Sequence, residues 1–234
     1  MANLVRSKTI NNWIKKFRNS MERSMLFRRF SLPLISLFAF IYPSSGIATT
    51  ILGMDIDKVA NDAELIFEGE VILHETRQDS NSGIINTYVT FKINDVLKGD
   101  YSSDLIELKF AGGSFNNQIV EVSGLVIPKD GEQGIYFVKS TSRNLLNPLL
   151  GWSQGHFLIH EVLGERRMRT IDQKPIIQIQ AVSSIPPSIK KPQALIEGNG
   201  DVAAGVNVDP DELTTERALT VDEFKDSILE LIEN

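Results

Sequence analysis

The sequence predicts an all-β protein, built as a small antiparallel β-barrel or β-sandwich and followed by a C-terminal amphipathic helix. Two long segments, 65–73 and 85–93, alternate apolar and polar residues, which is the period of a half-buried strand. Shorter apolar segments follow at nearly regular spacing, with turn residues between them, as in sandwiches and barrels. Because these connections are too short for the crossover helices of a parallel sheet, we expect antiparallel strands.

In chain order, the first predicted element is a short helical turn that begins at Asp55, a residue suited to capping it. The strand at 65–73 is followed by a polar turn, 79–83. The strand at 85–93 is rich in β-branched and aromatic residues, and the turn at 96–100 closes it. The remaining strands are expected at 105–110, 118–123, 134–139, 156–160 and 176–182.

The composition changes after the last of these strands. Residues 183–218 contain prolines and glycines, which is typical of a flexible linker. Thr220 and Glu223 then match a capping box, and apolar residues at helical spacing predict an amphipathic helix over 219–234. A helix of this length is marginal alone, so it docks either on the β-domain or in a partner's groove. Tethering favours the β-domain.

The N-terminal region is predicted to be an export signal. Residues 25–48 contain a short basic segment, about eleven mostly apolar residues, and then Gly46 and Ala48, the small residues of a cleavage site. The apolar run is too short to span a bilayer, which needs about 20 residues. We therefore expect cleavage after Ala48, an exported β-domain over 49–182 in the periplasm or outside the cell, and no integral membrane span after processing.

Residues 1–24 precede this signal and are basic, with apolar residues near helical spacing. Taken alone, this pattern is typical of an amphipathic helix on an anionic membrane surface. Since the signal peptide has its own methionine, Met25, the favoured interpretation is an upstream extension, with translation starting at Met25.

Composition and charge exclude several classes of function. The chain has no cysteine, which excludes a disulfide framework, thiolate zinc sites and cysteine catalysis. Residues 1–48 hold eight of the 24 basic residues but one of the 30 acidic ones, so residues 49–234 carry 16 basic and 29 acidic residues, a net charge of −13. A chain this acidic repels the phosphates of nucleic acid, and no nucleic-acid partner is predicted.

One catalytic motif is present, because Gly151–Gly155 matches the G-x-S-x-G pattern around Ser153. His156 and His160 follow, and either is a candidate base for a serine hydrolase. The context argues against catalysis, since residues 145–150 include a proline and do not alternate as a central strand should. The favoured interpretation is a turn that leads into a strand.

His156 and His160 are also the candidate metal ligands. Their spacing of four places both on one face of a strand or helix, and His74 with a carboxylate such as Glu161 would complete a metal site. The chain has no H-E-x-x-H pattern, and the residues between the two histidines are apolar, as in an ordinary sheet. Ordinary surface or half-buried histidines are therefore favoured, and no metal or cofactor is predicted.

Two segments, Ala63–Val71 and Thr87–Gly99, carry a family resemblance. Together they resemble the opening hairpin of a family of secreted bacterial proteins of unknown function, and the pattern is similar to that of netrin-like and metalloproteinase-inhibitor modules. The resemblance implies a closed or partly open β-barrel of the five-stranded oligonucleotide/oligosaccharide-binding type. The inhibitors bind their target's zinc through an N-terminal cysteine, whereas this chain has none and is predicted to begin at Thr49. No functional residue is therefore transferred.

The sequence thus predicts an exported, non-enzymatic binding or accessory module that acts on a secreted partner protein. The alternative is a serine hydrolase that uses Ser153 with His156 or His160.

Overall fold

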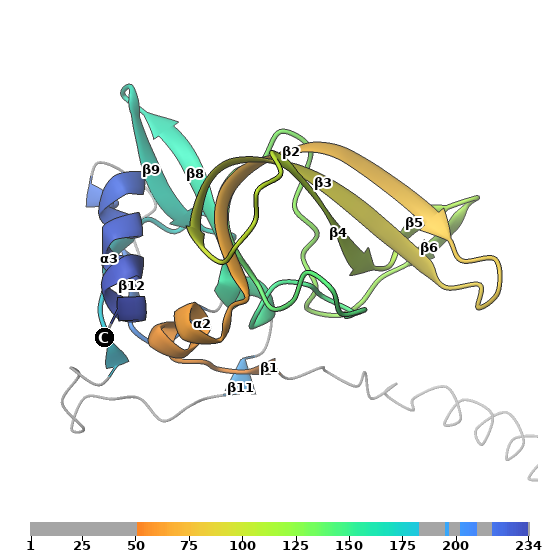
Figure 1. Cartoon of the computed structure of the whole chain (residues 1–234), viewed down its shortest axis with the longest axis horizontal. Coiled ribbons are helices and arrows are strands. Elements are labelled where there is room, and N and C mark those ends of the chain that lie inside the picture. The colour runs from red at the N-terminus through yellow and green to blue at the C-terminus, as the bar shows by residue number, and fades with distance from the viewer. Residues whose placement is uncertain (1–50, 183–194, 197–201, 210–216, 234) are drawn as a thin grey trace, which may run out of the picture. The chain divides into compact units, whose positions relative to one another are not determined.

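An antiparallel six-stranded sheet forms the centre of the fold, in a computed structural model of the chain (Figure 1). The predicted extension, 1–24, and the predicted signal peptide, 25–48, lie outside the residues that the structure describes. The described residues are 51–182, 195–196, 202–209 and 217–233.

The strand order across this sheet is β4-β3-β2-β7-β8-β9, with every neighbouring pair antiparallel. This confirms the predicted all-β class. Because β4 and β9 are the two edges, the sheet is not closed into a barrel. The strands are β2 (Leu65–Gln78), β3 (Ile85–Lys98), β4 (Leu105–Ala111), β7 (Gln133–Val138), β8 (His156–Val162) and β9 (Glu165–Thr170).

Smaller elements surround the sheet. Three two-stranded pairs are β1 (Ile51–Leu52) with β11 (Leu195–Ile196), β5 (Gly113–Phe115) with β6 (Gln118–Val120), and β10 (Ile176–Ile179) with β12 (Val206–Val208). The helices are α2 (Ile56–Asp62), α3 (Val221–Glu233) and a short 3-10 turn, Trp152–Gly155. Within the described ranges, no helix has the length and apolar character needed to cross a membrane.

Strands β2 and β3 are strongly bent (Figure 1). Their pairing register shifts at three places along β2, between residues 66 and 73, and such bulges bend a strand and increase its twist. Gly69 lies in this region, and a Cβ atom there would lie 2.8 Å from the Lys92 carbonyl oxygen. The close approach of the two backbones therefore requires glycine at this position.

The two faces of the sheet are buried in different apolar clusters, because neighbouring side chains of a strand point to opposite faces. Ile66 belongs to a cluster that includes residues of α2 and α3, and we call it the helix-side cluster. Leu65 and Phe67 belong to a second cluster, formed mainly by β2, β3, β4 and β7. One sheet thus supports two cores, one on each face.

Part of the predicted linker, 183–218, is structured. Residues 202–209 include β12, which pairs with β10, and they bury Ala203 and Val206 in the helix-side cluster. These apolar side chains and the β10 pairing explain why this portion packs rather than behaving as a linker. Apart from 195–196 and 217–218, the rest of the predicted linker lies outside the described residues.

The predicted C-terminal helix is present as α3, and its capping box forms. The Thr220 backbone N–H donates to Glu223 Oε2 at 2.8 Å, and the Glu223 backbone N–H donates to Thr220 Oγ1 at 3.3 Å. Phe224 is fully buried, with its ring centroid 5.1 Å from that of Phe157 on β8. The helix therefore docks on the β-domain, which is the alternative that tethering favoured.

Candidate functional site

Ser153 lies in the 3-10 turn that leads directly into β8. Gly151 and Trp152 enter the turn with φ angles of 63° and 61°, in the left-handed region. Ser153 is 6% exposed, and Gln154 beside it is fully buried, with its amide hydrogen-bonded to the backbone of Leu52 and Met54. Since a nucleophile must be accessible to its substrate, this arrangement favours a structural role for the turn.

His156 belongs to a largely buried cluster with Glu132 and Tyr136. Its Nε2 atom lies 2.7 Å from Glu132 Oε1, and the Tyr136 hydroxyl donates to the same carboxylate oxygen at 3.4 Å. The Tyr136 and His156 ring centroids are 5.1 Å apart. Burial, followed by the charge of Glu132, raises the pKa of Tyr136 well above its usual value, so its hydroxyl stays protonated and remains a donor.

The other two histidines have separate surroundings. His160 lies on β8 and is exposed; desolvation, followed by the charge of Arg169, lowers its pKa. His74 on β2 contacts a turn before β7, with Nδ1 2.5 Å from Asp130 Oδ1 and Nε2 against the Pro128 carbonyl oxygen. His74 thus holds this turn against β2.

The candidate metal ligands do not form a site. Over the part of the chain that the structure describes, no group of three histidine, aspartate or glutamate side chains is arranged to hold a metal ion. His74, His156, His160 and Glu161 are therefore not brought together as ligands.

The structure contains a surface site that the sequence did not predict, beside the hairpin of β5 and β6. The hairpin turns at Asn116 and Asn117, whose φ angles of 47° and 62° fit the type I′ turn that joins short antiparallel strands. At its base, the Gly112 backbone N–H donates to the Ile85 carbonyl oxygen at 2.9 Å. The Thr87 hydroxyl donates to the Gly112 carbonyl oxygen at 2.8 Å. These bonds fix the hairpin to β3.

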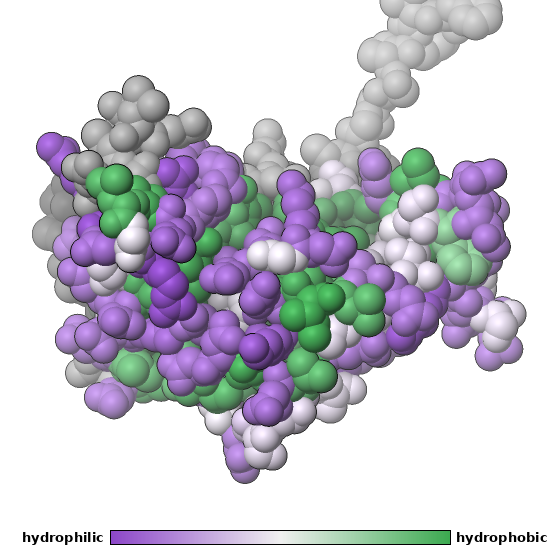
Figure 2. Space-filling view, turned by 90° about the horizontal axis from the view of Figure 1, so that it is seen from above, coloured by the Kyte–Doolittle hydropathy of each residue, from purple (hydrophilic) through white to green (hydrophobic). Residues whose placement is uncertain are grey.

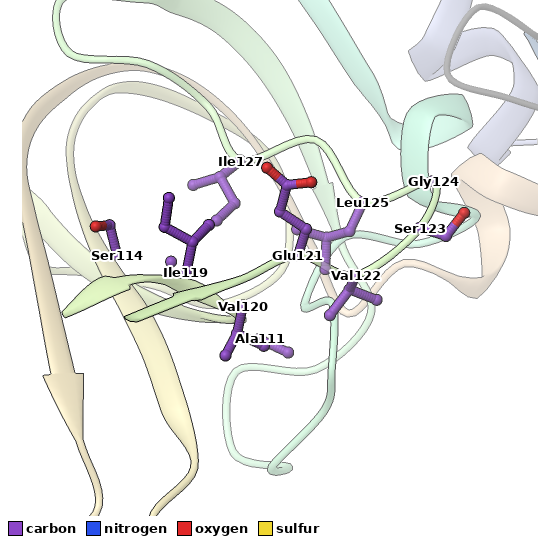
Figure 3. A pocket seen from close by; sticks show the side chains of 11 residues that line it. Ala111, Ser114, Ile119, Val120, Glu121, Val122, Ser123, Gly124, Leu125 and Ile127 are labelled. Carbon is purple, nitrogen blue, oxygen red and sulfur yellow. The ribbon is translucent and has the colours of Figure 1, made fainter. Parts of the chain in front are cut away.

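A hollow of about 460 Å³ lies between the hairpin and the segment 121–127, and we call it the β6 groove (Figure 3). Its volume is in the range of ligand sites, about 300–1,000 Å³. Leu125 and Ile127 pack against the second cluster of the core, which fixes this side of the groove. The large apolar residues and the one ionisable residue that line the groove are Ile119, Val120, Glu121, Val122, Leu125 and Ile127.

The apolar residues of β6 are unusually accessible. Ile119 is 71% exposed and Val120 is 43% exposed, and because neighbouring residues of a strand point to opposite faces, both faces of β6 are uncovered. Figure 2 shows apolar residues as scattered patches on one face of the molecule, which is ordinary for a protein surface. Ile119 and Val120 line a hollow, as Ile84 and Leu146 do elsewhere on the surface. Unlike those residues, they belong to a strand that pairs with one described neighbour only, β5.

One signal in the sequence points to this site: two successive asparagines between short strands, since asparagine tolerates the positive φ of a hairpin turn. The predicted strand at 118–123 is correct only over Gln118–Val120. From Glu121 the chain leaves the hairpin and forms the opposite side of the groove.

No protein-family model matches this chain, and no match is found among curated proteins or solved structures. Its function must therefore be inferred from its own residues.

Proposed function

We propose that this chain is an exported, non-catalytic binding module whose binding surface is the β6 groove and whose ligand is a secreted partner protein. One observation carries the proposal: exposed apolar side chains of an uncovered strand line an open hollow with firmly anchored sides. Exposed apolar surface in a concave site is the usual mark of an interaction site.

The chemistry of the groove supports binding rather than catalysis. Among the described residues that line it, Glu121 is the one ionisable group, whereas general acid–base catalysis by side chains uses a positioned acid or base close to the reacting atoms, commonly with a second titratable group. The candidate catalytic histidines are not part of this lining: His156 contacts Glu132, and neither His156 nor His160 lines the groove.

Export is the part of this proposal that rests on residues 25–48. The protein recovered from the periplasm or medium of its natural host is expected to begin at Thr49, or within a few residues of it, because Gly46 and Ala48 form the cleavage site. N-terminal sequencing with intact-mass measurement tests this. An exported protein that retains residues 1–24 would contradict both the signal peptide and the start at Met25.

Site-specific photo-crosslinking in the natural host tests the binding surface. A benzophenone amino acid at position Ile119 is expected to give a discrete covalent adduct with one exported protein. The same group at position Leu163, which is 86% exposed in the turn between β8 and β9, is the matched control and should give none. Equal adducts at both positions, or none at Ile119, would remove the groove as the binding surface.

The hydrolase alternative has its own readout. The protein that begins at Thr49 is expected to hydrolyse generic esters no faster than buffer, and Ser153→Ala should leave the Ile119 adduct unchanged. Ester hydrolysis that disappears in Ser153→Ala, and in no exposed-serine control such as Ser103→Ala, would show instead that the chain is an enzyme.

A further inference from the structure

Strand β6 has one unpaired edge. It pairs with β5 in a two-stranded sheet, and no other described strand pairs with it. A strand edge of this kind presents backbone N–H and C=O groups that can pair with another chain, and proteins usually block it with lysine, proline or a covering loop. The residues of β6 are Gln118, Ile119 and Val120, so the strand contains neither lysine nor proline, and all three residues are exposed.

The hairpin geometry identifies the residue that faces the open edge. In a hairpin with a two-residue loop, the residues flanking the loop are hydrogen-bonded to each other, and the next pair is not. Here Phe115 pairs with Gln118, and Ser114 pairs with Ile119. The backbone N–H and C=O of Ile119 therefore point away from β5, toward the open edge.

We propose that an extended segment of the partner protein adds to this edge as a third strand and places its apolar side chains in the β6 groove; this inference rests on the proposed function of the groove. Backbone hydrogen bonds to Ile119 give affinity, and the side-chain contacts give specificity, as in other cases of strand addition. A partner helix is disfavoured because its backbone groups are already paired internally.

The charge of the groove indicates which residues the partner segment contains. Figure 3 shows the side chains of Ile119 and Glu121 pointing to the same side, with the Glu121 carboxylate beside the apolar lining. Residues 49–234 carry a net charge of −13, which attracts cationic segments over a distance. The segment that binds is therefore apolar and β-branched, with a lysine or arginine opposite Glu121.

The occupant is a partner rather than a second copy of this chain. Two antiparallel β6 strands would bring Glu121 of one copy close to the edge of the other, between two bodies that are both strongly acidic, and like charges opposed across strands are destabilising. An apolar segment with a basic residue has no such repulsion.

A defined peptide tests the proposal on the protein that begins at Thr49. The probe is the end-blocked octapeptide Thr-Val-Thr-Val-Lys-Val-Thr-Val, titrated against the ¹⁵N-labelled protein by NMR. We expect amide shift changes confined to residues 112–127. Two matched control peptides have N-methyl groups on alternate amides of one edge or of the other. Methylation of the pairing edge should weaken binding about tenfold, the scale of one or two lost hydrogen bonds, and methylation of the other edge should not.

Three protein variants separate backbone from side-chain contributions. Ile119→Pro removes the outward N–H, and proline is tolerated on an edge strand when its nitrogen faces solvent; we expect about tenfold weaker binding. Ile119→Thr keeps the N–H and the β-branch and should retain more affinity than Ile119→Pro. Glu121→Gln should weaken the lysine peptide about threefold, and should not weaken a peptide with threonine in place of lysine.

Equal binding of the two methylated peptides, or shift changes outside residues 112–127, would overturn strand addition. A dimer that forms without peptide and is lost in Ile119→Pro, seen by analytical ultracentrifugation, would assign the edge to a second copy and also overturn it. If the Ile119 crosslink forms in cells but methylation has no effect, strand addition fails while the groove remains a binding surface. If the crosslink is absent, the proposed function itself fails.

Discussion

Replacing Phe224 with alanine is expected to lower the free energy of unfolding by about 3–5 kcal/mol, the range for truncating a buried aromatic side chain. Phe224 is fully buried in the helix-side cluster between α2, α3 and the sheet, and its ring packs against that of Phe157. The truncation removes apolar contacts and leaves a cavity that helix and sheet cannot both close. Chemical denaturation of the protein that begins at Thr49 measures this change.

Asp226→Ala is the matched control for this prediction. Asp226 lies two residues from Phe224 on the exposed side of α3, and we expect a change within about 0.5 kcal/mol. Limited proteolysis adds a local readout, because α3 should be cleaved first in Phe224→Ala. A loss below 1 kcal/mol together with an unchanged cleavage pattern would mean that α3 does not depend on this contact.

The helix and the two long strands could be predicted because their patterns are local. The capping box at Thr220 and Glu223 and the apolar spacing around Phe224 lie within one short segment, and the structure confirms both. The alternation in β2 and β3 is equally local. Their bend is not, because it depends on register shifts between the two strands and on the close approach of Gly69 to Lys92.

Strand β9 shows why part of the sheet was not predicted. Its residues, Glu165–Thr170, include three arginines and a single large apolar residue, Met168, which is fully buried. The sequence therefore indicates a basic, solvated stretch. Charged side chains are common on edge strands, where they discourage pairing with other chains. Strand β9 pairs with β8 in a hairpin closed by Leu163 and Gly164, but its own residues do not show the apolar alternation of a strand.

The groove could not be predicted for a related reason. Val122, Leu125 and Ile127 follow neither a helical nor a strand period, so their arrangement depends on the core that Leu125 and Ile127 cover. Ser153 and His156 are the opposite case, a motif that is easily recognised in the sequence. The structure places Ser153 in a buried turn and His156 in contact with Glu132.

The second large effect is expected at Glu68, whose side chain is 4% exposed on β2 between two cations. Its carboxylate oxygens lie 2.5 Å from Arg166 Nη1 of β9 and 2.5 Å from Lys225 Nζ of α3. Lys225 also contacts Asp95 at 2.8 Å. One buried carboxylate thus joins the sheet centre, the edge strand and the C-terminal helix.

Glu68→Gln is expected to lower the free energy of unfolding by about 3 kcal/mol. Removing one member of a buried ion pair leaves the other charge poorly compensated, at a cost of about 3–5 kcal/mol. The lower end of this range is expected because Arg166 is 46% exposed and Lys225 retains its ion pair with Asp95. The control is Glu75→Gln, which removes an exposed partner of Arg77 and should leave the denaturation midpoint unchanged.

The pH dependence isolates the contribution of the Lys225 ammonium to this effect. Burial alone would lower the pKa of Lys225, but hydrogen bonds to Asp95 and Glu68 outweigh it and raise the pKa above its usual 10.5. A raised pKa in the folded state means that the stabilisation is fully present below about pH 10.4 and is lost as pH rises through the folded-state value. The stability difference between the native protein and Glu68→Gln should therefore be constant from pH 7 to 9 and shrink above pH 10.5. A difference that stays constant above that pH would show that the Lys225 charge contributes nothing to it, and would assign the effect to Arg166 and to packing.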